Sequence, residues 1–512
     1  MTEFSKDYTK NVRILDLTNL HDAFADVESR YTENLIAGKP TGPRYNNLRS
    51  FLFDRETPFP ACCPNAEELR VAEDIIDGQT SMITCLRYLH KLVTLDVKNA
   101  TIGLGSFSGI TARLNCPALT ELKIQCTGTL DQENVHIANF IKSLDPHTLT
   151  KVSISGITQL SSIKKLMEGL NMHSESLRSL KLFGTTKRIL KLLPSVTFMP
   201  FLQELELVTS SRIPLSAKDN DGFVNWLFFL PSLTSLVLTG HDADYLVHRA
   251  LARPFNTIQK VAITLTRRED VPLFRYDLFF RGLASCQELV SCSLVDGHNH
   301  WSAGALIRCT SALKHLTTLK QLDLGIHGIS EPDVIALLHA LPALESARFC
   351  TQITDRTLRR LCRHNTTLRK FTCYGYLSSV SAATMIALLE LRDQDDSAPL
   401  TVTLDHSSKL AATPVSDLLH SVHTVTDGVV SDTYTLDGGS AIELRDPTHA
   451  VHKSDDDDDE KGGDYHHHHE HQKYVDYHHV DYPDDPDAVH DGTLVDDNES
   501  DVSDGEDFDG LI

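Results

Sequence analysis

The stretch LTTLKQLDLGIHGISEPDVIALLHALPAL, residues 316–344, decides the fold of this chain. Its residues Leu319, Leu322 and Leu324 are spaced by three and two, which matches neither a helix of period 3.6 nor a strand of period two. Because side chains alternate along a strand, Leu322 and Leu324 share one strand face, and Leu319 lies where the chain turns into that strand. The stretch therefore begins with a short strand that buries one face.

The second half of the stretch predicts a helix that returns the chain to the start of the next strand. Ser330 is a suitable N-cap, and Pro332 fits the first helical turn, where its missing N–H has no partner to lose. Pro342 ends the helix. Residues 354–365 predict a second helix of this kind. In the first helix the expected buried stripe consists of Val334, Ile335, Leu337, Leu338 and Leu341.

The same apolar spacing, at relative positions one, four and six, recurs along the chain. Eleven matches have first positions from 92 to 368, so the mean period is 27.6 residues, and individual spacings range from 24 to 31. A period of this length indicates a solenoid, in which each unit buries its apolar face against its neighbours. The matches are Leu92/Leu95/Val97, Leu119/Leu122/Ile124, Leu149/Val152/Ile154, Leu177/Leu180/Leu182, Leu202/Leu205/Leu207, Leu233/Leu236/Leu238, Ile258/Val261/Ile263, Leu289/Cys292/Leu294, Leu319/Leu322/Leu324, Leu344/Ala347/Phe349 and Leu368/Phe371/Cys373.

The segments LQELELVTS (202–210), LTSLVLTG (233–240) and LKQLDLGIHG (319–328) resemble the leucine-rich repeat family. The repeat length and the helical returns are similar to the ribonuclease-inhibitor-like subclass, which includes the repeat regions of F-box adaptors and of the Ran GTPase-activating protein. The resemblance covers roughly residues 80–395. It implies an α/β fold, a leucine-rich repeat solenoid shaped as a curved horseshoe, with a parallel sheet on the concave face and helices outside.

Four regions are expected along the chain. Residues 1–80 are an N-terminal cap with degenerate repeats, 81–395 the repeat array, 396–452 a C-terminal cap, and 453–512 a disordered tail rich in acidic residues and histidine. Apolar spacings that suggest the two caps are Val12/Leu15/Leu17, Leu48/Phe51/Phe53 and Ala66/Leu69/Val71 before the array, and Val402/Leu404 and Tyr434/Leu436 after it.

The net charge of −22 lies almost entirely in the tail, where residues 454–512 contain 18 Asp and 4 Glu against 2 Lys. The nearly neutral remainder shows no basic balance, so no direct nucleic-acid partner is expected. The tail is either a solubilising segment or a regulatory one that recruits a basic protein. No apolar stretch is long enough to span a membrane, and the eleven irregularly placed cysteines indicate free thiols. A cytoplasmic or nuclear protein with no membrane partner is expected.

Catalytic signatures are absent from the sequence. The segment GLGSFSG (103–109) lacks the further residues of a nucleotide loop, and KDNDGF (218–223) lacks the first and twelfth ligands of a calcium loop. We therefore expect no enzyme activity, no cofactor and no metal site.

Strand positions three, five and seven are expected to face outward on the concave side, opposite to the buried face. Apolar residues there indicate a docking floor for a protein, because exposed apolar patches mark interaction sites. The alternative is that these residues are simply favoured in strands. The predicted partner-binding residues are Phe183, Glu206, Val208, Val237, Ala262, Val295 and Arg348.

Four arginines, Arg356, Arg359, Arg360 and Arg363, are expected on the outer side of the helix predicted over 354–365. They form either an ordinary charged helix face or a dock for an anion. The nearest anion is the chain's own acidic tail, so these residues are the predicted tail-docking site.

The function that these patterns favour is a non-enzymatic protein-binding scaffold that uses the concave repeat surface. The similarity to F-box adaptors suggests a substrate receptor for ubiquitination. The alternative is a GTPase regulator or a histone-shielding protein, because both combine such repeats with an acidic tail.

Overall fold

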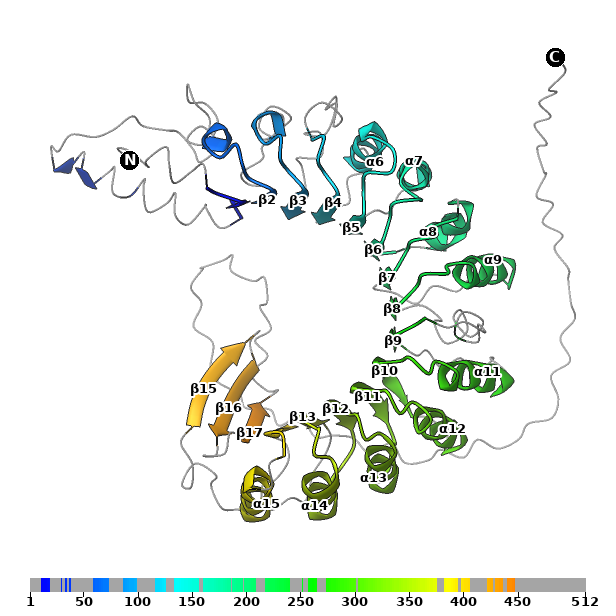
Figure 1. Cartoon of the computed structure of the whole chain (residues 1–512), viewed down its shortest axis with the longest axis vertical. Helices are drawn as coiled ribbons and strands as arrows, with labels where there is room; N and C mark the ends of the chain where they lie inside the picture. Colours follow the sequence, from blue (N-terminus) through cyan, green and yellow to red (C-terminus); the bar gives the residue numbers. More distant parts are fainter. Residues whose placement is uncertain are drawn as a thin grey trace, which may run out of the picture. The chain divides into compact units, whose positions relative to one another are not determined.

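The computed structural model describes most of the repeat array (Figure 1). The chain divides after Val451, and all described residues lie before that point. The acidic segment 453–512, expected to be disordered, and the predicted unit Leu48/Phe51/Phe53 lie outside the described residues. Described are residues 11–18, 29, 33–34, 36–37, 59–72, 86–98, 116–125, 133–155, 160–185, 187–196, 198–208, 217–239, 251, 257–264, 273–300, 303–374, 382–394, 397–405, 421–426, 429–435 and 440–446.

A strand recurs once in each unit and begins at position three of the repeat. Three further strands, β15 to β17, follow after the array. The strands are β1 (Ile14–Asp16), β2 (Glu68–Ala72), β3 (Thr94–Lys98), β4 (Glu121–Gln125), β5 (Lys151–Ser155), β6 (Ser179–Phe183), β7 (Glu204–Val208), β8 (Ser235–Thr239), β9 (Lys260–Thr264), β10 (Ser291–His300), β11 (Gln321–His327), β12 (Ser346–Cys350), β13 (Lys370–Tyr374), β14 (Thr401–Asp405), β15 (Ser421–Thr426), β16 (Val429–Thr435) and β17 (Ala441–Asp446).

Each strand from β1 to β14 pairs in parallel with the next one, and equivalent repeat positions lie opposite each other. Leu205 of β7 faces Leu236 of β8, for example. The carbonyl at position two of each unit accepts two backbone N–H groups from the next unit: Gln203 O accepts from Thr234 N at 2.8 Å and Ser235 N at 2.9 Å. This pair of hydrogen bonds recurs from Arg13 O to Glu345 O. The start of each strand from β2 to β13 is thereby fixed to the preceding unit, and the register follows.

The predicted core is confirmed. Every residue at positions one, four and six of the eleven predicted units is at most 3% exposed. Burying one such leucine side chain stabilises the fold by about 1.5–3 kcal/mol. In the two described N-terminal spacings the same positions are buried except Val12, which is half-buried. Leu15 and Leu69 lie opposite each other in β1 and β2.

Helices connect the strands and lie on the outer side of the strand array (Figure 1). In α13 the Ser330 hydroxyl caps the helix by accepting from Asp333 N at 3.3 Å, as predicted, and only Ile335 of the expected stripe is half-buried instead of buried. The helices are α6 (Glu133–Ser143), α7 (Leu160–Met172), α8 (Lys187–Leu192), α9 (Ala217–Phe228), α11 (Leu273–Ala284), α12 (Ala303–Leu313), α13 (Glu331–Ala340), α14 (Asp355–His364) and α15 (Ala382–Gln394), with short 3-10 helices η1 (Phe59–Cys62) and η4 (Leu193–Ser195).

The parallel sheet, the period and the outer helices together make the fold an open leucine-rich repeat solenoid, as the sequence predicts. None of the helices in the described part of the chain is long and apolar enough to cross a membrane.

The sheet beyond β14 is built from a strand that the sequence did not single out. β17 pairs in parallel with β14, so that Ile442 lies opposite Val402 and continues the repeat register. The predicted cap residue Tyr434 lies in the antiparallel strand β16, and Leu436 is outside the described residues. Ser440 directly precedes β17. The Asp393 carboxylate of α15 accepts hydrogen bonds from the backbone N–H and the hydroxyl of Ser440.

Candidate functional site on the concave face

The five predicted apolar contact residues all lie half-exposed on the inner side of the sheet. Phe183 and Val208 occupy position seven of β6 and β7 and face each other in register. Val237 and Ala262 form the equivalent pair at position five of β8 and β9. Val295 occupies position seven of β10.

These residues form a stripe across β6 to β10, which we call the apolar stripe; it occupies position seven on β6 and β7, position five on β8 and β9, and position seven again on β10. Along position seven, Thr239 and Thr264 separate Val208 from Val295. Contact along the stripe therefore depends on diagonal neighbours, which lie about 7–8 Å apart in a sheet. The structure thus brings together two close pairs and one further residue.

Charged side chains of the early units neutralise each other across neighbouring strands. Glu206, a predicted partner contact, binds Lys181 at 3.1 Å. Lys151 binds Glu121 at 2.7 Å. Exposed pairs of this kind contribute about 0–1 kcal/mol, so their main effect is to satisfy the charges. Glu206 is consequently one half of an internal ion pair.

A polar pocket of about 400 Å³ opens on the concave face of β10 to β13. It contains Arg348, the last of the predicted contact residues, whose side chain is 51% exposed. Its charged and hydroxyl-bearing side chains include Ser291, Ser293, Asp323, Ser346, Arg348 and Lys370.

The carboxylate that lines this pocket is that of Asp323, and its hydrogen bonding is incomplete. Its Oδ2 lies 3.4 Å from the hydroxyl of Ser293 and 3.4 Å from Nη1 of Arg348, both longer than an ordinary hydrogen bond. Its Oδ1 is buried and has no hydrogen-bond partner within the described part of the chain. Burial raises the pKa of Asp323, against the opposing influence of Arg348 and Ser293. The side chain as a whole is 27% exposed to the pocket.

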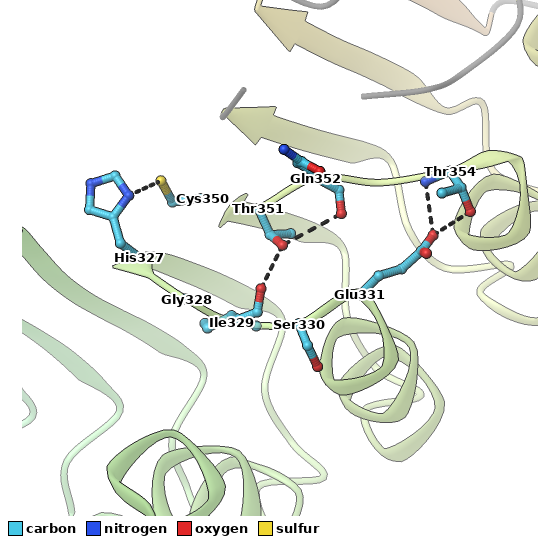
Figure 2. Close-up of a pocket in the computed structure, with 9 residues that line it drawn as sticks. All are labelled: His327, Gly328, Ile329, Ser330, Glu331, Cys350, Thr351, Gln352 and Thr354. Carbon is cyan, nitrogen blue, oxygen red and sulfur yellow. Dashed lines mark hydrogen bonds between the residues drawn. The ribbon is translucent and has the colours of Figure 1, made fainter. Parts of the chain in front are cut away.

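A second pocket of about 420 Å³, which we call the connector pocket, lies where β11 and β12 lead into α13 and α14. Figure 2 shows His327 and Cys350 facing each other at its edge, with Cys350 Sγ 3.2 Å from His327 Nδ1. The Thr351 hydroxyl donates to Ile329 O at 2.6 Å and joins the two connectors. Gly328 has a φ of 95°, a conformation that favours glycine, and it lets the chain turn toward α13.

Glu331 binds the start of the next helix on the far side of this pocket (Figure 2). Its Oε1 accepts from the backbone N–H of Thr354 at 2.8 Å, from the Thr354 hydroxyl at 2.6 Å and from the Thr357 hydroxyl at 2.5 Å. Burial alone would raise the pKa of Glu331, but these hydrogen bonds outweigh burial and lower it. Glu331 therefore fixes α14 against α13.

The predicted tail-docking residues lie on α14, and all four guanidinium groups are exposed. Among the described residues none of them forms an ion pair. We call Arg356, Arg359, Arg360 and Arg363 the arginine surface. Their proposed ligand, the acidic segment, lies outside the described residues.

A group of exposed phenylalanines, which we call the edge patch, was missed by the sequence analysis. Phe198, Phe201 and Phe229 are 55%, 53% and 64% exposed, and the ring of Phe228 lies 5.4 Å from that of Phe229. The patch spans two neighbouring units. Phe198 and Phe229 each lie four residues before the first position of the following unit, so aligning the repeats at that position would have revealed them.

Asp323 and Cys350 were missed for a different reason. The rule that positions three, five and seven face the concave side also places Asp323 at position five and Cys350 at position seven, but their partners depend on the strand register. Among the described residues no group of three or more His, Cys, Asp or Glu side chains could hold a metal ion.

No known family model matches the chain, and no curated protein matches it. Similar solved structures include the Rad7 and Elc1 complex in yeast, with 15% identity over 75% of this chain and 83% of that chain and a TM-score of 0.34. They also include the leucine-rich repeat-containing protein LegL7 from Legionella pneumophila, with 12% identity over 59% and 90% and a TM-score of 0.31.

A third similar structure is the TLR13–ssRNA13 complex, with 15% identity over 67% of this chain and 46% of that chain and a TM-score of 0.35. The leucine-rich repeat assignment of this chain rests on its own repeat spacing and on the parallel array from β1 to β14.

Proposed function

We propose that this leucine-rich repeat protein is a non-enzymatic scaffold that binds a partner protein on the concave face of β6 to β13. The observation that carries the proposal is the continuity of two surfaces. Val295 ends the apolar stripe, and Ser293, two positions earlier on β10, begins the polar pocket. Protein interfaces combine an apolar centre with polar groups that find partners at its border. The two surfaces together have this composition.

The partner expected here presents apolar side chains to the stripe and a hydrogen-bond donor to the Asp323 carboxylate. Half-exposed valine and phenylalanine side chains gain when a partner removes water from them. The Lys181–Glu206 pair at the other end of the stripe is already satisfied internally, so it is expected to contribute little.

Affinity purification from cell extract tests this proposal, with captured proteins identified by mass spectrometry. Val237→Asp places a charge within the stripe, and Ser153→Asp places the same charge at position five of β5, outside it. We expect Val237→Asp to reduce capture about 10-fold or more and Ser153→Asp to leave it unchanged. Circular dichroism checks that both variants are folded.

Two outcomes would count against the concave face. Capture by a folded Val237→Asp variant equal to that by the unchanged chain would exclude the stripe. Loss of the same proteins only with Phe229→Ser would place binding at the edge patch instead.

The finer proposal is a substrate receptor of F-box-like type, and it predicts that a ubiquitin-ligase scaffold is captured with the chain. The alternative proposal is a GTPase regulator or a histone-shielding protein. Stimulated GTP hydrolysis that is lost when the repeats are deleted would favour the former. Histone capture that is lost in a version ending at Val451 would favour the latter.

The arginine surface supports a second binding proposal, because four exposed cations that form no ion pair with any described residue attract an acidic peptide. The chain's own acidic segment has the complementary charge. A synthetic peptide of residues 453–512 is expected to bind a version ending at Val451 at low salt and to dissociate as salt rises. Replacing all four arginines by glutamine is expected to abolish this binding. Equal binding by that variant would refute the proposal.

A further inference from the structure

The connector pocket places a nucleophile and a base side by side at the edge of a cavity. Cys350 ends β12, His327 ends β11, and Sγ lies 3.2 Å from Nδ1 (Figure 2). At this distance the thiol donates to the imidazole when the imidazole carries its proton on Nε2. A thiol with a histidine within hydrogen-bond reach is the arrangement that activates a cysteine.

The other described cysteines have different surroundings. Those at 63, 116, 286, 292, 309, 362 and 373 are buried, and only Cys62 and Cys350 are half-buried. Burial raises the pKa of Cys63 to about 11 and that of Cys116 to about 12. A buried thiol is both protonated and out of reach of a reagent. Cys350 is the described cysteine that combines partial exposure, a neighbouring imidazole and an adjoining cavity.

We propose that Cys350 is a modification site, where the thiol reacts with a low-molecular-weight disulfide admitted by the connector pocket. His327 accepts the thiol proton, and the thiolate attacks one sulfur of the disulfide. A new bond joins Cys350 Sγ to that sulfur while the original S–S bond breaks. The departing thiolate takes the proton from His327, so a free thiol leaves and no further oxidant is needed.

The cavity supports this assignment independently of the two side chains. Its volume of about 420 Å³ falls in the range of small-molecule sites. Cys350 occupies position seven of β12, two residues after Arg348 of the polar pocket. A group attached to Cys350 therefore lies beside the proposed partner surface, although the reaction does not depend on the existence of that partner.

Competitive labelling of the folded full chain tests the proposal. The chain is treated with limiting iodoacetamide, and the labelling rate of each cysteine is measured by mass spectrometry. Cys62 is the matched half-buried control. We expect Cys350 to be labelled about 10-fold faster than Cys62, and His327→Gln to reduce the Cys350 rate by a similar factor while leaving the Cys62 rate unchanged.

Treatment with oxidised glutathione is a second measurement on the same samples. A mixed disulfide is expected at Cys350 first, and later or less in the His327→Gln variant. Circular dichroism confirms that the variant is folded, and His327→Asn replaces it if it is not. Labelling of Cys350 no faster than Cys62, or a rate unaffected by removing the imidazole, would overturn the proposal.

Discussion

The guanidinium group of Arg392, in α15, donates a hydrogen bond at 2.7 Å to the carbonyl oxygen of Leu368, which is the first residue of the same unit. The same side chain donates to the carbonyl oxygens of Leu361 at 3.1 Å, Thr366 at 3.1 Å and Ala398 at 3.0 Å. Arg392 is 1% exposed, and burial lowers its pKa. Backbone carbonyls thus replace water around a buried cation and tie the last helix to the array.

Arg392→Met is expected to destabilise the protein by about 3 kcal/mol or more, because buried carbonyl oxygens lose their donors. Arg392→Lys should also destabilise it, since one ammonium group cannot reach four carbonyls in this arrangement. Chemical denaturation measures the free energy of unfolding. The control is Arg363→Met on the exposed face of α14, for which we expect a change within about 0.5 kcal/mol. Equal effects at the two positions would contradict this account.

His173 predicts a loss of stability on acidification. Its ring is fully buried, with Nδ1 3.3 Å from Leu149 N and Nε2 3.3 Å from Ile141 O. These contacts fit the neutral ring, and burial is the main reason why its pKa is lowered from 6.5. The stabilisation is therefore complete above about pH 6.5 and is lost as the pH falls toward the lower folded pKa.

The measurement is the free energy of unfolding of the wild type and of His173→Gln, taken at a series of pH values from about 8 to about 5. The wild type is expected to lose up to about 1.4 kcal/mol more per pH unit below pH 6.5 than the variant. Parallel profiles for the two proteins would show that the pKa of His173 does not differ between the folded and unfolded states.

Glu331→Ala is expected to weaken the attachment of α14 by removing three hydrogen bonds, at a cost of about 1–3 kcal/mol. Because the folded pKa of Glu331 is lowered from 4.5, its stabilisation is present above that pH and disappears as the pH falls through the folded value. Hydrogen exchange of α14 amides measures the local effect at neutral pH. Glu345→Gln, at an exposed ion pair with Lys320, is the control and should leave exchange in α14 unchanged.

Asp323→Asn is expected to leave the stability unchanged or to raise it by about 1 kcal/mol, because the buried carboxylate lacks a partner for Oδ1. The folded pKa of Asp323 is raised above 3.8, so its ionised form destabilises the fold at neutral pH, and this effect fades as the pH falls through the folded pKa.

The same Asp323→Asn variant should bind the captured partner less well, which separates a binding role from a structural one. Thermal unfolding and partner capture are measured together. Glu206→Gln, at the satisfied pair with Lys181, is the matched control and should affect binding little. A clear loss of stability in Asp323→Asn would show that this carboxylate supports the fold instead.

The sequence by itself determined the repeat and its core. Positions one, four and six are buried in every predicted unit because strand alternation and stacking of equivalent units act the same way at each step. The cap of α13 at Ser330 followed equally from local chemistry, since an N-cap involves only residues of its own turn. These features depend on short segments of the chain, so they can be predicted from the amino-acid sequence alone.

Only the tertiary structure decided which side chains meet between units. These contacts join residues more than 20 positions apart: the pairs Lys181–Glu206 and His327–Cys350, the hydrogen bonds from Arg392 to the carbonyl oxygens of Leu361, Thr366 and Leu368, and the pairing of β17 with β14. Unit lengths vary from 24 to 31 residues, so the register, set by backbone hydrogen bonds between neighbouring units, is needed to align them. The concave residues were thus predictable by face, whereas their charges, pockets and partners were set by the packing of one unit against the next.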